Sequence, residues 1–116
     1  MEISILKQVL TTLIDRTNTS DVKITYGDVC SLLNDVVKPR GLKHYLNPIK
    51  DACEQLGLPP LTIIVVSSVS GLPGDGFFNR SDLTRYEKKE ILDKSIIEVA
   101  NCKDWTPLLN YFSVNQ

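Results

Sequence analysis

The chain has 116 residues, a hydrophobic fraction of 42%, a charged fraction of 23% and a formal net charge of −1. These values exclude an intrinsically disordered chain and are typical of one globular domain, which at this length buries a core without disulfides or metal ions. A net charge near zero excludes a general attraction to nucleic acid or membranes, so such binding requires a local patch. We therefore expect a single domain over residues 1–116.

Segments for secretion or membrane insertion are not evident in the sequence. No apolar run approaches the roughly 20 residues of a membrane span, and the first residues lack the basic start and cleavage site of a signal peptide. We predict a cytoplasmic protein without membrane contact. Cys30, Cys53 and Cys102 are odd in number, far apart and set in apolar patterns, which indicates reduced core residues. No disulfide, metal site or cofactor is expected.

The first elements follow from hydrophobic periodicity. Apolar residues recur at spacings of three and four over residues 3–16, which predicts a helix. A short β segment is expected at residues 22–24. Thr25 then begins a helix that ends at Asn34, with Asp28 placed near its free N-terminal amides.

The next helical pattern contains an internal stop signal. Asn47 and Pro48 form a pair suited to an N-cap and a first turn, so two abutting helices are predicted at about residues 41–46 and 48–56. Gly57 fits the left-handed position after the last turn.

The second half of the chain begins with a β-branched run. Residues 61–67 read Leu-Thr-Ile-Ile-Val-Val-Ser, which predicts the central strand. A glycine-rich turn is expected at residues 68–76. Ser81 is expected to cap a charged region that reaches Ala100 as one or two helices, before a last short turn after Trp105. The predicted fold is an α/β (α+β) domain, mostly helical and winged-helix-like, with a small sheet around residues 61–67. Three aromatic residues are expected to be buried around this strand: Tyr26, Phe77 and Trp105.

Catalytic groups are scarce. His44 is the only histidine, so a metal site would depend on scattered cysteines and carboxylates without the usual ligand spacing. A nucleophile pair of Cys30 or Cys53 with His44 stays open, but both cysteines occupy apolar helical positions typical of inert thiols. The sequence therefore predicts that the protein is not an enzyme.

Two segments are candidate binding sites. Residues 36–50 contain four basic residues, a histidine and no acidic residue, while the other 101 residues carry nine basic and fourteen acidic residues. A helix here offers hydrogen-bond donors to phosphates and base edges, although an ordinary solvated helix face explains the same charges. The candidate contact residues are Lys38, Arg40, Lys43, His44, Asn47 and Lys50.

The second candidate is the glycine-rich segment at residues 71–78, which reads Gly-Leu-Pro-Gly-Asp-Gly-Phe-Phe. Its backbone amides offer phosphate contacts, but the lysine and hydroxyl residue of a P-loop are missing, so a tight turn is favoured. Its candidate residues are Gly71, Gly74, Asp75 and Gly76.

Residues 24–29 read Ile-Thr-Tyr-Gly-Asp-Val and residues 39–42 read Pro-Arg-Gly-Leu. This block resembles the helix-turn-helix half of the alkyltransferase-like DNA-binding proteins, in which an arginine-bearing recognition helix follows. The Pro-Cys-His-Arg-Val motif of that family is absent, because residues 58–66 read Leu-Pro-Pro-Leu-Thr-Ile-Ile-Val-Val. The resemblance implies a winged-helix-like shape without alkyl transfer.

A longer resemblance covers most of the chain. It rests on residues 26–28 (Tyr-Gly-Asp), 57–62 (Gly-Leu-Pro-Pro-Leu-Thr), 65–66 (Val-Val), 71–77 and 104–105 (Asp-Trp), with Val99. These pieces resemble an uncharacterised module of bacterial and phage proteins that often precedes HNH-type nuclease domains in restriction-like systems. No histidine-rich ββα-metal pattern follows here, so the resemblance implies a defence or counter-defence setting in which this chain is the binding part.

These observations predict a non-enzymatic binding protein of phage or mobile-element type. It is expected to dock on a nucleic-acid-handling enzyme or on its nucleic acid, for example as an inhibitor of host restriction or CRISPR machinery. The alternative is a winged-helix-like DNA-binding regulator, or a recruiting subunit of a restriction-like system, which the basic stretch supports. An enzyme with a cysteine-based or loop-based activity is the third interpretation. The oligomeric state stays open.

Overall fold

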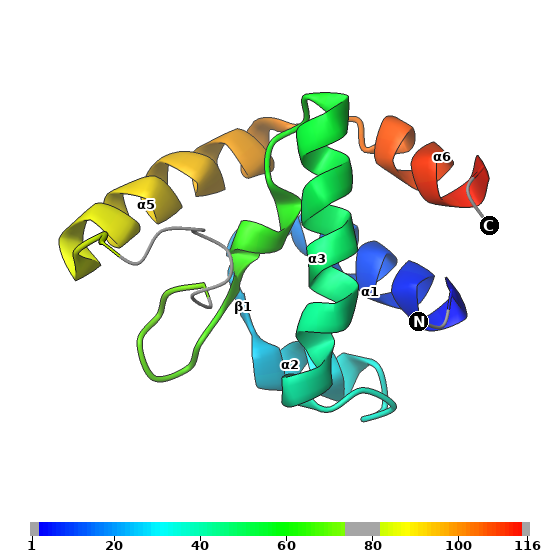
Figure 1. Ribbon diagram of the computed structural model, residues 1–116, viewed down its shortest axis with the longest axis horizontal. Helices are drawn as coiled ribbons and strands as arrows, with labels where there is room; N and C mark the ends of the chain where they lie inside the picture. Colours follow the sequence, from blue (N-terminus) through cyan, green and yellow to red (C-terminus); the bar gives the residue numbers. More distant parts are fainter. Residues whose placement is uncertain (1–2, 74–81, 115–116) are drawn as a thin grey trace.

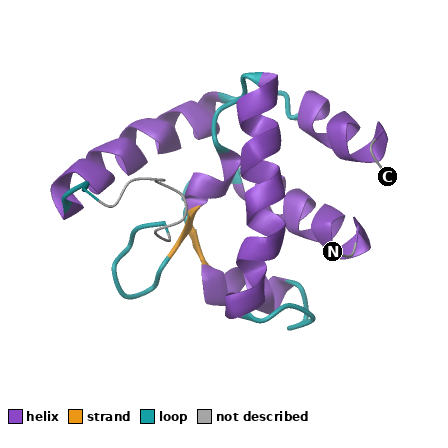
Figure 2. Ribbon diagram, in the orientation of Figure 1, coloured by secondary structure: helices purple, strands orange, loops and turns teal. Residues whose placement is uncertain are grey.

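The computed structural model describes residues 3–73 and 82–114, which form one mostly helical α+β unit (Figure 2). Its elements in chain order are α1 (Ile3–Arg16), β1 (Ile24–Thr25), α2 (Tyr26–Leu32), α3 (Pro39–Leu56), the 3-10 helix η1 (Leu61–Ile64), β2 (Val65–Val66), α5 (Arg85–Asn101) and α6 (Thr106–Val114). Helix α3 crosses the middle of the molecule and packs on α1, α2, α6 and η1, while α5 and α6 extend to opposite sides (Figure 1).

The first helix confirms the prediction from periodicity. Leu6, Val9, Leu10 and Leu13 lie on one face of α1 and are buried. At its end, the Arg16 guanidinium donates two hydrogen bonds to the Lys23 carbonyl, at 3.1 and 2.7 Å. These bonds tie α1 to the segment that leads into β1.

Strand β1 and helix α2 meet at Thr25. Its hydroxyl accepts a hydrogen bond from the Asp28 amide at 3.1 Å, which confirms the predicted helix start and the place of Asp28 in the first turn. The predicted β segment at residues 22–24 is shifted slightly, to Ile24 and Thr25. These two residues pair in parallel with β2, and this pair is the only sheet among the described residues.

The predicted central strand at residues 61–67 is wrong for most of its length. Residues 61–64 form η1, and only Val65 and Val66 are a strand. A buried strand needs hydrogen-bonding partners along its backbone, and β1 supplies only two residues. The 3-10 turn instead bonds the Ile63 amide to the Pro60 carbonyl at 3.0 Å and the Val65 amide to the Thr62 carbonyl.

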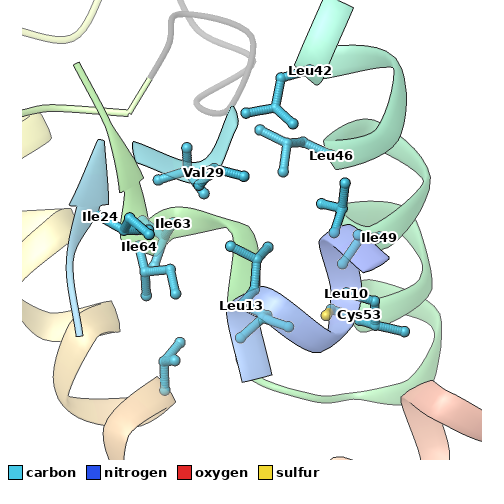
Figure 3. Close-up of a cluster of buried hydrophobic side chains, with 14 of the residues drawn as sticks. Leu10, Leu13, Ile24, Val29, Leu42, Leu46, Ile49, Cys53, Ile63 and Ile64 are labelled. Atoms are coloured by element: carbon cyan, nitrogen blue, oxygen red, sulfur yellow. The ribbon is translucent and has the colours of Figure 1, made fainter. Parts of the chain in front are cut away.

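The predicted break at Asn47 and Pro48 does not occur, because α3 is one helix from Pro39 to Leu56. Pro48 lacks the amide that would bond the His44 carbonyl, so α3 continues through this position with one internal hydrogen bond fewer. The buried face continues across the proline, and its packing on the core keeps both halves in one helix (Figure 3). Its buried residues are Leu42, Leu46, Ile49, Ala52 and Cys53.

Helix α5 is single and begins later than predicted. Thr84 caps it, since the Thr84 hydroxyl accepts from the Glu87 amide at 3.1 Å and the Glu87 carboxylate accepts from the Thr84 amide at 3.2 Å. Ser81, the predicted cap, lies outside the described residues. The last predicted turn is the nine-residue helix α6, and the Asp104 carboxylate accepts from the Thr106 amide at its start.

The core centres on α1, α3 and η1, and buried residues of β1, α2, β2, α5 and α6 complete it; Figure 3 shows part of this cluster. Trp105 is buried as predicted, Tyr26 is only half-buried, and Phe77 lies outside the described residues. Cys30 and Cys53 are buried core residues, which confirms that part of the cysteine prediction, whereas Cys102 is half-buried.

Alanine substitutions at two exposed glycines are expected to have opposite effects. Gly57 ends α3 with a φ of 68°, so alanine there is strained and should lower the free energy of unfolding by about 1–2 kcal/mol. Gly27 lies in α2 with nothing within 4 Å of an added Cβ, so alanine there should raise it by about 0.4–1 kcal/mol. Urea denaturation measures both, and a shift in the same direction would contradict the assigned backbone conformations.

Candidate functional site

The predicted basic residues lie together on the first half of α3. Arg40, Lys43, His44 and Asn47 are all exposed, and their spacings of three and four residues place them on one face of the helix. Lys38 is exposed at the N-cap position, two residues before Arg40. We call this set the α3 basic face.

The core sets the orientation of this face. Leu42, Leu46 and Ile49 are buried, at 0%, 7% and 0% exposure, and they anchor the opposite side of α3 (Figure 3). Because α3 packs on α1, α2, α6 and η1 through that side, the basic face is held on a rigid element.

Lys50 differs from the other predicted contact residues. Its side chain is only 12% exposed, and its ammonium lies 3.2 Å from the Glu54 carboxylate one turn further along α3. Lys50 therefore serves an ion pair within the helix, and the α3 basic face ends at Asn47.

The charges of α3 oppose the dipole of the helix. Acidic residues favour a helix N-terminus and basic residues its C-terminus, but the first turn of α3 has no acidic residue and its last turn no basic one. Arg40 and Lys43 instead follow the N-cap, while Asp51 and Glu54 lie near the end. Helix stability does not explain this order of charges.

A tight turn precedes α3 and was not predicted. Asn34 and Asp35 both adopt positive φ, at 57° and 59°, and the Asp35 amide donates to the Cys30 carbonyl at 2.9 Å. Leu32 and Val36 flank them and are 63% and 59% exposed. The sequence signal was the Asn-Asp pair, because these residue types tolerate the left-handed conformation.

The glycine-rich candidate is described only at its start. Gly71 has a φ of 71°, and its amide donates to the Ser67 carbonyl at 2.8 Å, so a turn already uses this donor. Gly74, Asp75 and Gly76 lie outside the described residues.

Cys30 and Cys53 are buried thiols. Burial raises the pKa of both Cys30 and Cys53, and the Leu61 backbone lowers the Cys53 value only in part. His44 instead lies on the exposed side of α3. Within residues 3–73 and 82–114, no three histidine, cysteine or acidic side chains converge as metal ligands would.

Two open depressions are lined by residues of the described part of the chain. One, of about 370 Å³, lies between α1 and α2 and is lined by Lys7, Gln8, Thr11, Thr12, Leu32 and Leu33. The other, of about 320 Å³, lies between the segment at residues 19–23 and the end of α5. Neither of these two depressions is lined by a histidine or a cysteine.

No helix in the described part of the chain is long and apolar enough to cross a membrane. The chain matches no protein-family model, no curated protein sequence and no solved structure. Proposals about its function therefore rest on its own residues.

Proposed function

We propose that the protein is a non-enzymatic binding protein that docks on nucleic acid through the α3 basic face. The order of charges on α3 supports this proposal, because Arg40 and Lys43 lie exposed where they oppose the helix dipole. Long basic side chains on a rigid helix neutralise phosphates, and the Arg40 guanidinium adds a fork that can bind phosphate or guanine in a bidentate manner. His44 and Asn47 continue the face with further hydrogen-bond groups.

The order of elements fits the same proposal. Helix α2, a turn at residues 33–38 and helix α3 follow one another as in a helix-turn-helix, with α3 in the place of the recognition helix. In this proposal the domain is winged-helix-like, and its role is that of a DNA-binding regulator or a recruiting subunit in a defence setting.

Reversing two charges tests the site. The variant Arg40→Glu with Lys43→Glu should weaken binding to a labelled DNA duplex by at least about tenfold, at every sequence, and should lower the salt slope by about two. Fluorescence anisotropy over a range of salt concentrations measures both quantities. The new acidic residues suit the N-terminus of α3, so the melting temperature should not fall.

A matched control carries the same change in net charge elsewhere. Lys94→Glu with Lys103→Glu alters two exposed lysines, one on α5 and one after it. It should retain most of the affinity. If both variants lose the same amount of affinity, binding depends on the net charge of the protein and not on the α3 basic face. If the wild-type chain binds neither duplex nor single-stranded DNA at low salt, the proposal is overturned.

The second candidate function is docking on a protein of a nucleic-acid-handling system, as an inhibitor of restriction or CRISPR machinery. The exposed Leu32 at the end of α2 and Val36 in the turn before α3 favour it, because exposed apolar side chains are typical contacts of protein interfaces. In that case Leu32→Ser should weaken binding to the partner while salt has little effect.

A further inference from the structure

On the exposed side of α3 the charged residues are spaced symmetrically about Asn47, and the sign of the charge reverses there. Arg40, Lys43, Asn47, Asp51 and Glu54 follow one another at spacings of three, four, four and three residues. With 3.6 residues per turn, all five lie along one face, and all five are exposed. Two basic residues precede Asn47, and two acidic residues follow it at the same distances.

This pattern is complementary to itself. If two copies of α3 lie antiparallel with Asn47 at the twofold axis, Arg40 of each copy faces Glu54 of the other. Lys43 of each copy then faces Asp51 of the other. Four opposite-charge contacts result, which is the arrangement of an interface in which the same patch serves both subunits. A parallel pairing instead places like charges together.

The face is available for such a contact. Helix α3 lies in front of the other helices in Figure 1, and none of the described elements covers its exposed side. Arg40, Lys43 and Asp51 take part in no ion pair among the described residues, while Glu54 uses one oxygen for Lys50 and remains 63% exposed.

We propose that this face binds a second copy of the chain as an antiparallel α3 pair. The contact is polar, and exposed ion pairs contribute little each, so the dimer is weak, with a dissociation constant on the order of 1 mM at low salt. Added salt dissociates it by screening. The dimer covers the α3 basic face, so self-association and nucleic-acid binding compete. The dimer nevertheless does not depend on the proposed function.

Two double variants and their mixture provide the test. Arg40→Glu with Lys43→Glu makes the face acidic, and Asp51→Lys with Glu54→Lys makes it basic. Each variant alone should sediment as a monomer at concentrations where the wild-type chain dimerises. Their equimolar mixture restores four opposite-charge contacts and should dimerise at least as tightly as the wild type. The first variant places acidic residues toward the N-terminus of α3 and the second places basic residues toward its C-terminus, and both placements are favourable to the helix dipole. Circular dichroism should therefore show folded proteins.

The register is tested by a single cysteine. Asn47→Cys places one thiol of each copy at the proposed twofold axis, so mild oxidation should link two copies of this variant. Glu98→Cys, an exposed control on α5, should stay unlinked. The Asn47→Cys link should disappear when Asp51→Lys and Glu54→Lys are added.

The outcomes separate the two proposals. A wild-type chain that remains monomeric at millimolar concentration and low salt, or a mixture that does not associate, would overturn the dimer. Nucleic-acid binding by Asp51→Lys with Glu54→Lys is measured separately. It should become tighter if both proposals hold, whereas a wild-type chain that dimerises but binds no DNA at low salt would overturn the proposed function and leave the dimer standing.

Discussion

Replacing Trp105 by alanine is expected to lower the free energy of unfolding by about 3–5 kcal/mol. The side chain is 5% exposed and lies between the end of α5 and the start of α6. The backbone carbonyl of Trp105 also accepts hydrogen bonds from the amides of Leu108 and Leu109, at 3.0 and 3.1 Å, in the first turn of α6. Emptying this site therefore leaves a cavity where α6 joins the core. Chemical denaturation followed by circular dichroism measures the loss.

Phenylalanine at the same position is the matched control. The indole Nε1 of Trp105 is buried without a hydrogen-bond partner among the described residues, so its removal costs no hydrogen bond. Trp105→Phe keeps most of the apolar volume and should cost less than about 1.5 kcal/mol. If phenylalanine costs as much as alanine, a hydrogen bond of the indole holds this site and the packing argument fails.

The second large change in stability is expected in η1, where substitutions at two positions of one turn should change the free energy of unfolding in opposite directions. Ile64 is fully buried, and alanine there should cost about 2–5 kcal/mol through lost burial and a cavity. Thr62 is also buried, but its hydroxyl lacks a hydrogen-bond partner in the described part of the chain. Valine has nearly the same shape without that polar atom, so Thr62→Val should raise the free energy of unfolding by about 1 kcal/mol.

Val69→Ala is the reference for both substitutions. Val69 is 94% exposed, so its replacement should change the free energy of unfolding by less than about 0.5 kcal/mol. The midpoint of urea denaturation is measured for all three variants, and the midpoints are compared where the slopes of the transitions are equal. A loss of stability in Thr62→Val would show that the hydroxyl is bonded in solution, and an unchanged midpoint in Ile64→Ala would remove η1 from the core.

Local signals were sufficient for the elements whose stability depends on nearby residues. The apolar spacing of α1, the cap at Thr25 and the left-handed Gly57 were all predicted, because each concerns contacts within a few positions. Predictions from the same kind of signal were wrong where distant packing decides. Pro48 is a stop signal by itself, but the buried face on both sides of it keeps α3 continuous.

The segment at residues 61–67 shows the same limit. Its β-branched residues indicate a strand, and only the tertiary structure shows that β1 offers two residues of pairing while α1, α3 and α5 surround the rest. Backbone hydrogen bonds must be satisfied locally in such a place, and the 3-10 turn of η1 satisfies them.

For the candidate site, the sequence by itself determined which segment carries the basic residues, because charge composition is a property of the chain alone. Only the tertiary structure decided that Arg40, Lys43 and Asn47 share an exposed face with Asp51 and Glu54. It also decided that Lys50 forms an ion pair with Glu54. The physical reason is that a helix presents every third or fourth residue on one side, and the core contacts of Leu42, Leu46 and Ile49 decide which side faces solvent.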